Sequence, residues 1–184
     1  MFVRNWMSAP AVAISPGASA GAALESMEKR RIRRLPVMAD GRLVGIVTKS
    51  DLQDGRGSLR RPAALTVGDV MSPEPVTVDP DEPLETATKR MLDRKISGLP
   101  VLDGGKLVGI ITESDLFRAL ASMLGIGEKG ARILMTVRDD GDLLSDVGRR
   151  LNGLAVRSLV TVHDPKRKVW DVVLRARGRA PRPA

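Results

Sequence analysis

The sequence contains two copies of one unit. Residues 3–52 align with residues 67–116 without a gap, and 21 of the 50 aligned residues are identical. Each copy has the apolar pattern of a strand, a helix, two strands and a second helix. A unit with one small sheet and two helices cannot bury its apolar surface alone, whereas two copies packed sheet to sheet can. The repeat therefore predicts an α/β (α+β) module built from two packed copies.

The second copy shows its elements most clearly. Residues 76–78 are expected to form a short strand, and apolar residues recur with helical spacing over 84–91. The run Asp-Pro-Asp-Glu at 79–82 has the order of a helix start, with Asp at the N-cap and Pro at the first helical position. Gly104-Gly105 between two apolar runs predicts a hairpin turn, and a second helix is expected over 112–124.

Three motifs make the chain resemble the cystathionine-β-synthase (CBS) domain family in tandem. They are Met71-Ser72, Leu99-Pro100-Val101 and the run from Gly109 to Asp115, each with a counterpart in the first copy. The resemblance covers roughly residues 1–123. It implies one CBS repeat over 1–60 and a second over 61–124. It also implies a regulatory protein that binds an adenine nucleotide in the cleft between the repeats. The glycine-rich run over 125–130 lacks the context of a dinucleotide-binding loop and is predicted to be a linker.

Both copies keep a threonine and an aspartate three residues apart, where a strand is expected to pass into a helix. These are Thr48 with Asp51 and Thr112 with Asp115. Locally, this spacing is that of a capping box. The same geometry leaves a carboxylate that can accept ribose hydroxyls, as an acidic residue does in dinucleotide folds. The family resemblance implies this role for both aspartates, with the threonines nearby, so two sites are expected.

The two copies differ just before the Leu-Pro-Val strand. The first copy has Arg33 and Arg34, where the second has Ser97 and Gly98. The resemblance implies phosphate contacts from the two arginines, whose forked donors suit phosphate, although a solvated basic face remains the alternative. Arg118, three residues after the second aspartate, is a further phosphate candidate. The copies are therefore expected to be unequal, with cations supplied by the first and space by the second.

Composition argues against catalytic and metal-binding functions, which are the alternatives to a ligand-binding role. The chain has no cysteine and one histidine, His163, which removes thiol catalysis, disulfides and ordinary structural zinc sites. The repeats contain no paired carboxylates, metal-ligand cluster or P-loop, so we expect no enzyme, no catalytic residue and no metal site. No cofactor is required. The expected ligand is AMP, ADP, ATP or S-adenosylmethionine, and Mg²⁺ would enter only through ATP phosphates.

The net charge of +8 favours anionic partners. Nucleic-acid binding is an alternative, but aromatic residues make up only 2% of the chain, and single-stranded nucleic acids are bound by aromatic stacking. A structural dimerisation module with empty sites is another alternative. No apolar run approaches the roughly 20 residues that span a bilayer, and no signal-like segment opens the chain. We therefore expect no membrane contact and a cytoplasmic location.

Residues 131–178 have a different pattern, namely strand, helix, strand, strand. The run from Val137 to Leu143 is similar to the opening of an ACT domain, a ferredoxin-like β-α-β-β-α-β fold, whose second helix and fourth strand are missing here. The resemblance implies either an amino-acid site or a dimerisation sheet, and a homodimer would cover the exposed sheet edge. A CBS pair followed by an ACT-like domain resembles the bacterial acetoin-utilisation proteins, and implies a regulated partner protein. The basic, proline-rich tail at 179–184 is expected to be disordered.

Overall fold

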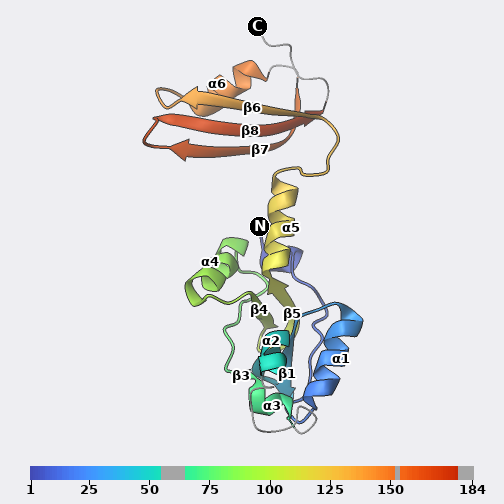
Figure 1. Ribbon diagram of the computed structural model, residues 1–184. Coiled ribbons are helices and arrows are strands. Elements are labelled where there is room, and N and C mark those ends of the chain that lie inside the picture. Colours follow the sequence, from blue (N-terminus) through green and yellow to red (C-terminus); the bar gives the residue numbers. More distant parts are fainter. Residues whose placement is uncertain (55–64, 152–153, 178–184) are drawn as a thin grey trace. The chain divides into compact units, whose positions relative to one another are not determined.

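The computed structural model describes residues 1–54, 65–151 and 154–177 (Figure 1). The chain forms two compact units, Met1–Leu116 and Phe117–Ala184. The expected boundary between the repeats at residues 60 and 61 and the expected disordered tail at 179–184 lie outside the described residues.

The two repeats form matching elements. The first has α1 (Ala20–Arg30), β1 (Arg34–Ala39), β2 (Arg42–Thr48) and α2 (Lys49–Asp54). The second has α4 (Leu84–Arg94), β4 (Gly98–Asp103), β5 (Lys106–Thr112) and α5 (Glu113–Met123). In both repeats the two strands form an antiparallel hairpin, and the register shifts at the equivalent place in each. The predicted turn at Gly104-Gly105 is confirmed, since both glycines have positive φ, and the second helix lies within the predicted range.

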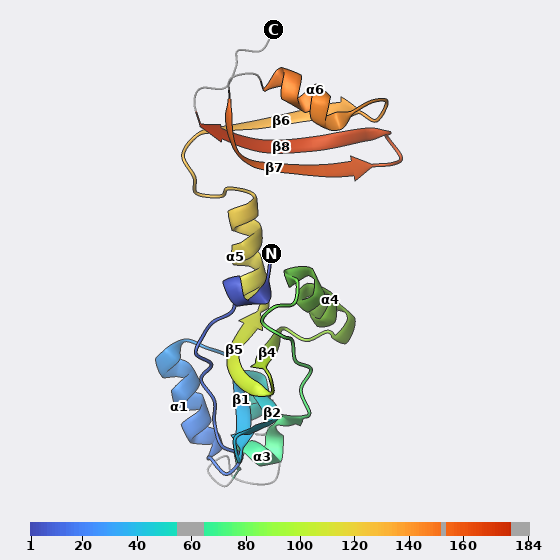
Figure 2. The same ribbon diagram turned by 180° about the vertical axis from the view of Figure 1, so that it is seen from behind.

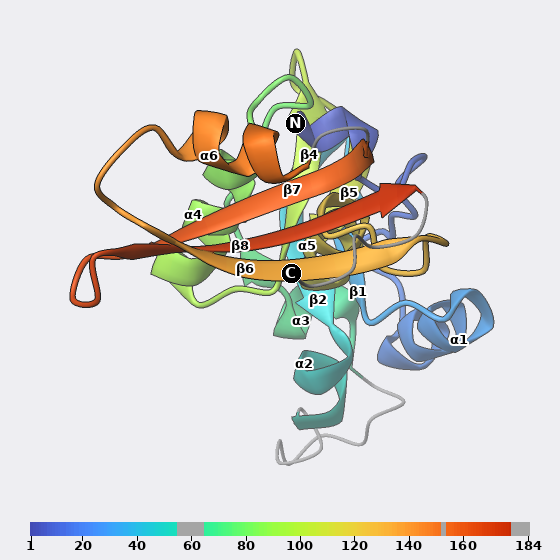
Figure 3. The same ribbon diagram turned by 90° about the horizontal axis from the view of Figure 1, so that it is seen from above.

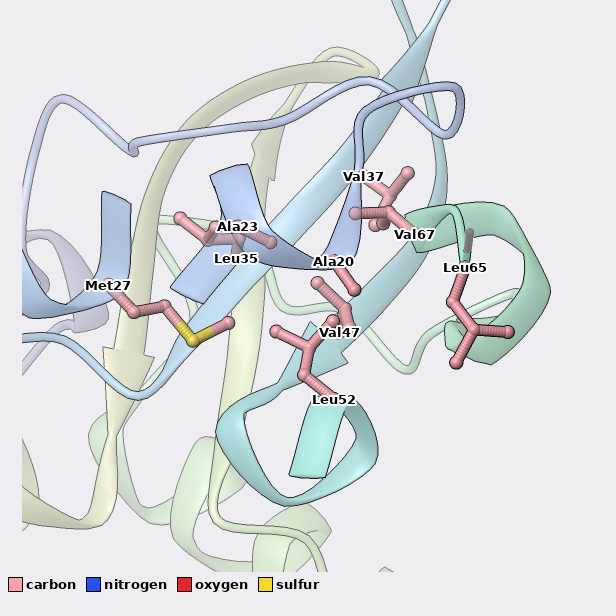
Figure 4. Close-up of a cluster of buried hydrophobic side chains, with 9 residues drawn as sticks. All are labelled: Ala20, Ala23, Met27, Leu35, Val37, Val47, Leu52, Leu65 and Val67. Carbon is pink, nitrogen blue, oxygen red and sulfur yellow. The ribbon is translucent and has the colours of Figure 1, made fainter. Parts of the chain in front are cut away.

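The first repeat encloses an aliphatic core (Figure 4). Nine buried side chains form it: Ala20, Ala23, Met27, Leu35, Val37, Val47, Leu52, Leu65 and Val67. Burying a side chain such as leucine or valine contributes about 1.5–3 kcal/mol, so this cluster is a main source of stability for the repeat. Leu65 and Val67 come from the segment that opens the second repeat, which therefore packs on the first.

The opening segments of the two repeats are exchanged. The first segment includes η1 (Val3–Asn5) and lies at the start of α4, where Val3 N donates to the Glu82 carbonyl over 3.0 Å (Figures 1 and 2). The second segment includes α3 (Val67–Val70) and lies at the start of α1, where Val67 N donates to the Ala18 carbonyl over 2.8 Å. Each repeat is thus completed by residues that precede the other.

Each exchanged segment then pairs with a strand of the repeat on which it packs. Ser8 exchanges backbone hydrogen bonds of 2.9 and 3.0 Å with Ile110 of β5, and β3 (Ser72–Pro73) pairs with β2. The methionine before each serine lies over a glycine. A Cβ at Gly109 would lie 2.7 Å from Met7 Sδ, and one at Gly45 would lie 2.5 Å from the Met71 sulfur. Both glycines are therefore required by the close approach of the exchanged segment.

Two local predictions for the second repeat are wrong. The strand expected at 76–78 is reduced to a single bridge from Val78 to Val101. The helix expected from 79–82 begins later, at Leu84. Asp79 N does donate to Glu82 Oε1 over 3.0 Å, but this bond closes a turn instead of a helix. The reason is Pro83, because a residue that precedes proline is driven out of the helical region.

The second unit is a β-α-β-β layer (Figure 3). It contains β6 (Ala131–Arg138), α6 (Leu143–Arg150), β7 (Ala155–Asp164) and β8 (Val169–Arg177). The antiparallel sheet has the order β6-β8-β7. α6 packs on one face of the sheet, where Val147 and Leu151 meet Val172 and Leu174 in a separate core.

Two polar clusters fix the end of this unit where β6 leads into α6. Asp139 accepts from Trp170 Nε1 over 3.0 Å and lies 2.7 Å from His163 Nε2; these hydrogen bonds, from Trp170 first and then His163, lower the pKa of Asp139. Asp142 caps α6, and hydrogen bonds from Ser145 lower the pKa of Asp142. The single histidine therefore belongs to a structural cluster of the second unit.

Candidate functional site

The two threonine–aspartate pairs form the same corner in both repeats. Thr48 ends β2, and Asp51 lies in the first turn of α2. The Thr48 N–H and the Thr48 hydroxyl both donate to Asp51 Oδ2 over 2.8 Å. Thr112 and Asp115 repeat this arrangement between β5 and α5, with distances of 2.7 and 2.6 Å. In each corner the two donors reach Oδ2, so Oδ1 lies outside the capping box.

The two corners differ in burial. Asp115 is 1% exposed, and no other charged residue in the described part of the chain is buried. Asp51 is half-buried. A buried carboxylate is stable only when hydrogen-bond donors compensate for its lost hydration. The corner of the second repeat is therefore a more enclosed polar position than the corner of the first.

Arg34 crosses from the first repeat to the second. Its Nη2 donates to Ser97 Oγ over 2.8 Å, although 63 residues separate them in sequence. The guanidinium lies over Gly98, where a Cβ would collide with Nη1. Arg34 pairs with Thr48 across the first hairpin, and Gly98 pairs with Thr112 across the second, so Arg34 lies beside both corners.

The charge of Arg34 is partly desolvated and is surrounded by other charged groups. Burial lowers the pKa of the Arg34 guanidinium, and the like charge of Arg33 lowers it further, whereas Glu113 and Asp115 act in the opposite direction. The two carboxylates thus belong to the electrostatic surroundings of this cation. An anion bound here would meet a guanidinium that is not fully hydrated.

The remaining predicted residues lie at different depths. Ser97 is half-buried, and its carbonyl accepts from Glu113 N over 3.3 Å. Arg33 is exposed, and its carbonyl accepts from Lys49 N over 2.8 Å at the equivalent place in the first repeat. Arg118 is exposed on α5 and belongs to the second unit, Phe117–Ala184. The structure therefore brings Arg34, Ser97 and Gly98 together, and leaves the Arg33 and Arg118 side chains on the surface.

Sequence reasoning missed two features of the repeats. The indole Nε1 of Trp6 is buried and has no acceptor among the described residues. Trp6 directly precedes Met7, whose sulfur lies against Gly109. Glu113 and Lys49 occupy equivalent positions with opposite charge, a signal that the gapless alignment of the two copies contains.

Two further features of the described residues bear on function. No three histidine, aspartate or glutamate side chains in ranges 1–54, 65–151 and 154–177 are grouped as a metal site would need. No helix in the same ranges is long and apolar enough to cross a membrane.

Comparison with known families gives a match to the CBS domain over residues 3–55 and 67–122, which correspond to the two repeats. A CBS domain-containing protein of Dictyostelium discoideum is 33% identical over 136 residues, which cover 67% of this chain and 94% of the relative. The family match ends at residue 122, so it includes only the first six residues of the second unit and none of β6, α6, β7 or β8.

Solved structures of CBS pairs share the fold. The pair of protein MJ0100, in complex with 5′-methylthioadenosine and S-adenosyl-L-methionine, has a TM-score of 0.61 at 28% identity, covering 66% of this chain and 96% of its own. CBSX2 in complex with AMP has a TM-score of 0.59 at 30% identity, covering 69% and 99%. AcuB from Vibrio cholerae, a protein assigned to acetoin utilization, has a TM-score of 0.62 at 28% identity, covering 68% and 94%.

Proposed function

Because the chain belongs to the CBS-domain family, we propose that it is a non-catalytic regulatory protein that binds an adenine nucleotide between its two repeats. Ligand binding would change the CBS pair and, through it, the second unit or a partner protein. Two similar CBS pairs are complexes with adenine compounds, AMP in one and 5′-methylthioadenosine with S-adenosyl-L-methionine in the other. The ligand class for this chain is therefore AMP, ADP, ATP or an S-adenosyl compound.

The observation that carries this proposal is the pair of equivalent corners. In each, the threonine holds Oδ2 of the aspartate and orients the carboxylate. We assign the ribose hydroxyls to Asp51 and Asp115, since a fixed carboxylate can accept both hydroxyls of a ribose. Thr48 and Thr112 are positioning residues.

Anionic groups of the ligand would bind the neighbouring cations. Arg33, Arg34 and Arg118 are the proposed phosphate contacts, and Ser97 with Gly98 supplies space and a hydroxyl. No metal is required, and Mg²⁺ would accompany ATP only. An unsubstituted adenosine ligand would use the corners alone.

Calorimetric titration with AMP, ADP, ATP and S-adenosylmethionine tests the proposal. Wild type is expected to bind at least one of them, and Asp51→Ala and Asp115→Ala should each remove one site. A hydrogen bond to a charged group contributes about 1.5–3 kcal/mol. If the substituted site still binds, its affinity should therefore be at least about ten-fold weaker, while the other site is unchanged. Asp93→Ala, which removes an exposed partner of Lys89, is the matched control and should bind as wild type does. Absence of binding to all four ligands at millimolar concentration would refute the proposal.

For the second unit we propose a truncated ACT-like domain that forms a homodimer contact. The sheet order β6-β8-β7 with α6 on one face supports the resemblance, and exposed Leu134 and Val162 lie on the other face. An amino-acid ligand at the turn before α6 is the alternative role. Sedimentation equilibrium distinguishes a dimer from a monomer, and titration with amino acids tests the alternative.

One observation favours a second candidate function, a structural module with empty sites. The Arg34 guanidinium occupies the space over Gly98, as a cleft filled by its own side chains would require. The titration above decides between the two, because a purely structural module binds none of the adenine ligands.

A further inference from the structure

The positive charge of the chain is concentrated in the second unit. Residues 117–184 contain 14 lysines and arginines against 7 aspartates and glutamates, whereas residues 1–116 contain 16 against 15. The second unit, although it is the shorter of the two, therefore carries +7 of the net charge of +8. An excess of one sign destabilises a compact unit through self-repulsion and attracts partners of the opposite sign.

The directions of the strands bring much of this charge to one end of the sheet. β6 and β7 run parallel to each other and antiparallel to β8, so both begin where β8 ends (Figure 1). The last turn of α6 leads to the same place, since Leu154 N, just before β7, donates to the Leu151 carbonyl over 2.9 Å. We call this the basic end. Its five exposed cations are Lys129, Arg132, Arg150, Arg157 and Arg177.

These five cations have no acidic partner in the part of the chain that the structure describes. The ion pairs of the second unit involve Arg149, His163 and Arg167 instead. Four of the seven acidic residues lie at the opposite end, in the β6–α6 turn and at the end of β7: Asp139, Asp140, Asp142 and Asp164. The charges of this unit are therefore separated along the strands.

The register of the sheet adds a like-charge pair at the basic end. Arg132 of β6 lies directly opposite Arg175 of β8, and like charges in such a pair are destabilising. Arg175 donates to the carbonyls of Leu124 and Glu128 over 3.1 and 3.4 Å. Leu174 and Ala176 belong to the core beneath α6, so Arg132, Arg175 and Arg177 share the opposite face of the sheet. An anion bound at this end would relieve their repulsion.

We propose that the basic end binds the phosphate backbone of double-stranded nucleic acid without sequence preference. This activity goes beyond the proposed nucleotide binding and does not depend on it. Four of the five cations are arginines, whose forked donors match phosphate oxygens. A duplex carries about one negative charge per 1.7 Å of its axis, so an end of three strands, about 10 Å across, faces several phosphates at once.

Other anionic or self-associated partners fit this end less well. Single-stranded nucleic acids and membrane interfaces are bound with the help of aromatic side chains, and β6, α6 and β7 contain no Phe, Trp or Tyr. A second copy placed here by a two-fold axis would bring the same arginines together, because such a contact pairs one patch with itself. The homodimer contact proposed above would therefore lie away from the basic end.

The test is fluorescence anisotropy of the full chain with a labelled DNA duplex of about 20 base pairs, over a range of salt concentrations. Wild type is expected to bind, with log K falling against log salt at a slope of about −4 for five phosphate contacts. The triple variant Arg132→Gln, Arg157→Gln, Arg177→Gln should reduce this slope by about 3 and weaken binding about ten-fold per arginine at about 50 mM salt. The matched control is Lys166→Gln, Arg167→Gln, Lys168→Gln, which removes the same charge from the β7–β8 hairpin and should bind nearly as wild type does.

Several results would overturn the inference. No binding of the duplex by wild type at about 50 mM salt refutes it, and an equal loss in the two triple variants shows that net charge alone is responsible. A single strand of the same length has about half the charge density and should bind more weakly, so tighter binding of the single strand contradicts the choice of a duplex. Tighter binding to phosphatidylserine vesicles than to the duplex would assign this end to a membrane surface. Calorimetric titration with adenine nucleotides should be unchanged in both triple variants, so a failure here leaves the proposed function standing.

Discussion

Replacing Gly109 with alanine is expected to destabilise the first unit, because an exchanged segment occupies the space over this glycine. A Cβ there would lie 2.7 Å from Met7 Sδ and 3.0 Å from the Ser8 carbonyl oxygen. Forcing a methyl group into a filled site costs about 1–3 kcal/mol. The reduced entropy of the unfolded chain offsets about 0.4–1 kcal/mol of this. The net loss is therefore about 1–2 kcal/mol, or a decrease in Tm of about 4–8 °C for a unit of this size.

Urea denaturation followed by circular dichroism and by tryptophan fluorescence, to which Trp6 of the first unit and Trp170 of the second both contribute, measures this loss. Gly17→Ala is the matched control, since its Cβ would have no neighbour nearer than 3.8 Å, and this variant should be at least as stable as wild type. Adding Met7→Ala to Gly109→Ala should destabilise less than the sum of the two single changes, because the shorter side chain frees the space. The reasoning is wrong if Gly109→Ala is as stable as Gly17→Ala, or if the two changes are additive.

Other predictions concern the corners and the second unit. Thr112→Val should lower the free energy of unfolding by about 1–3 kcal/mol, because the buried Asp115 loses a hydrogen-bond donor. Thr48→Val should lower it less, because Asp51 is half-buried. Equal losses of the two variants in urea denaturation would contradict this reasoning. The lowered pKa values of Asp139 and Asp142 mean that the folded second unit binds fewer protons in acid than the unfolded chain. Stability from these carboxylates is therefore complete above pH 3.8, their ordinary pKa, and is lost as the pH falls through the lowered values. Thermal melts across the acid range should show a shallower decline for Asp139→Asn and Asp142→Asn than for wild type.

Most of the elements follow from the sequence because their causes are local. The glycine pair at 104–105 provides the positive φ of a hairpin turn, and threonine with aspartate at 112 and 115 marks a strand that passes into a helix. The strand expected at 76–78 and the start of α4 were exceptions. The Asp-Pro-Asp-Glu run before α4 forms the expected hydrogen bond, but the second proline, Pro83, moves the helix start to Leu84.

The exchange of segments could not be predicted from the sequence. The segment that contains Val67 has the same apolar spacing whether it packs on its own repeat or on the other. Periodicity therefore does not indicate which repeat the segment completes. The position of Arg34 is hidden for the same reason. The sequence shows that Gly98 leaves space, but only the packing of the two repeats places an arginine in it.

The exchanged opening segments also constrain how such a chain can arise. A protein with one repeat would lack the segment that completes its hairpin and the methionine that fills the space over its glycine. Such a protein would have to form a two-fold symmetric pair in which two identical chains trade their first residues. Duplication and fusion of its gene would convert that interface between chains into one within a chain. Once both copies lie on one chain, each can change independently, and an arginine in one can come to face a glycine in the other.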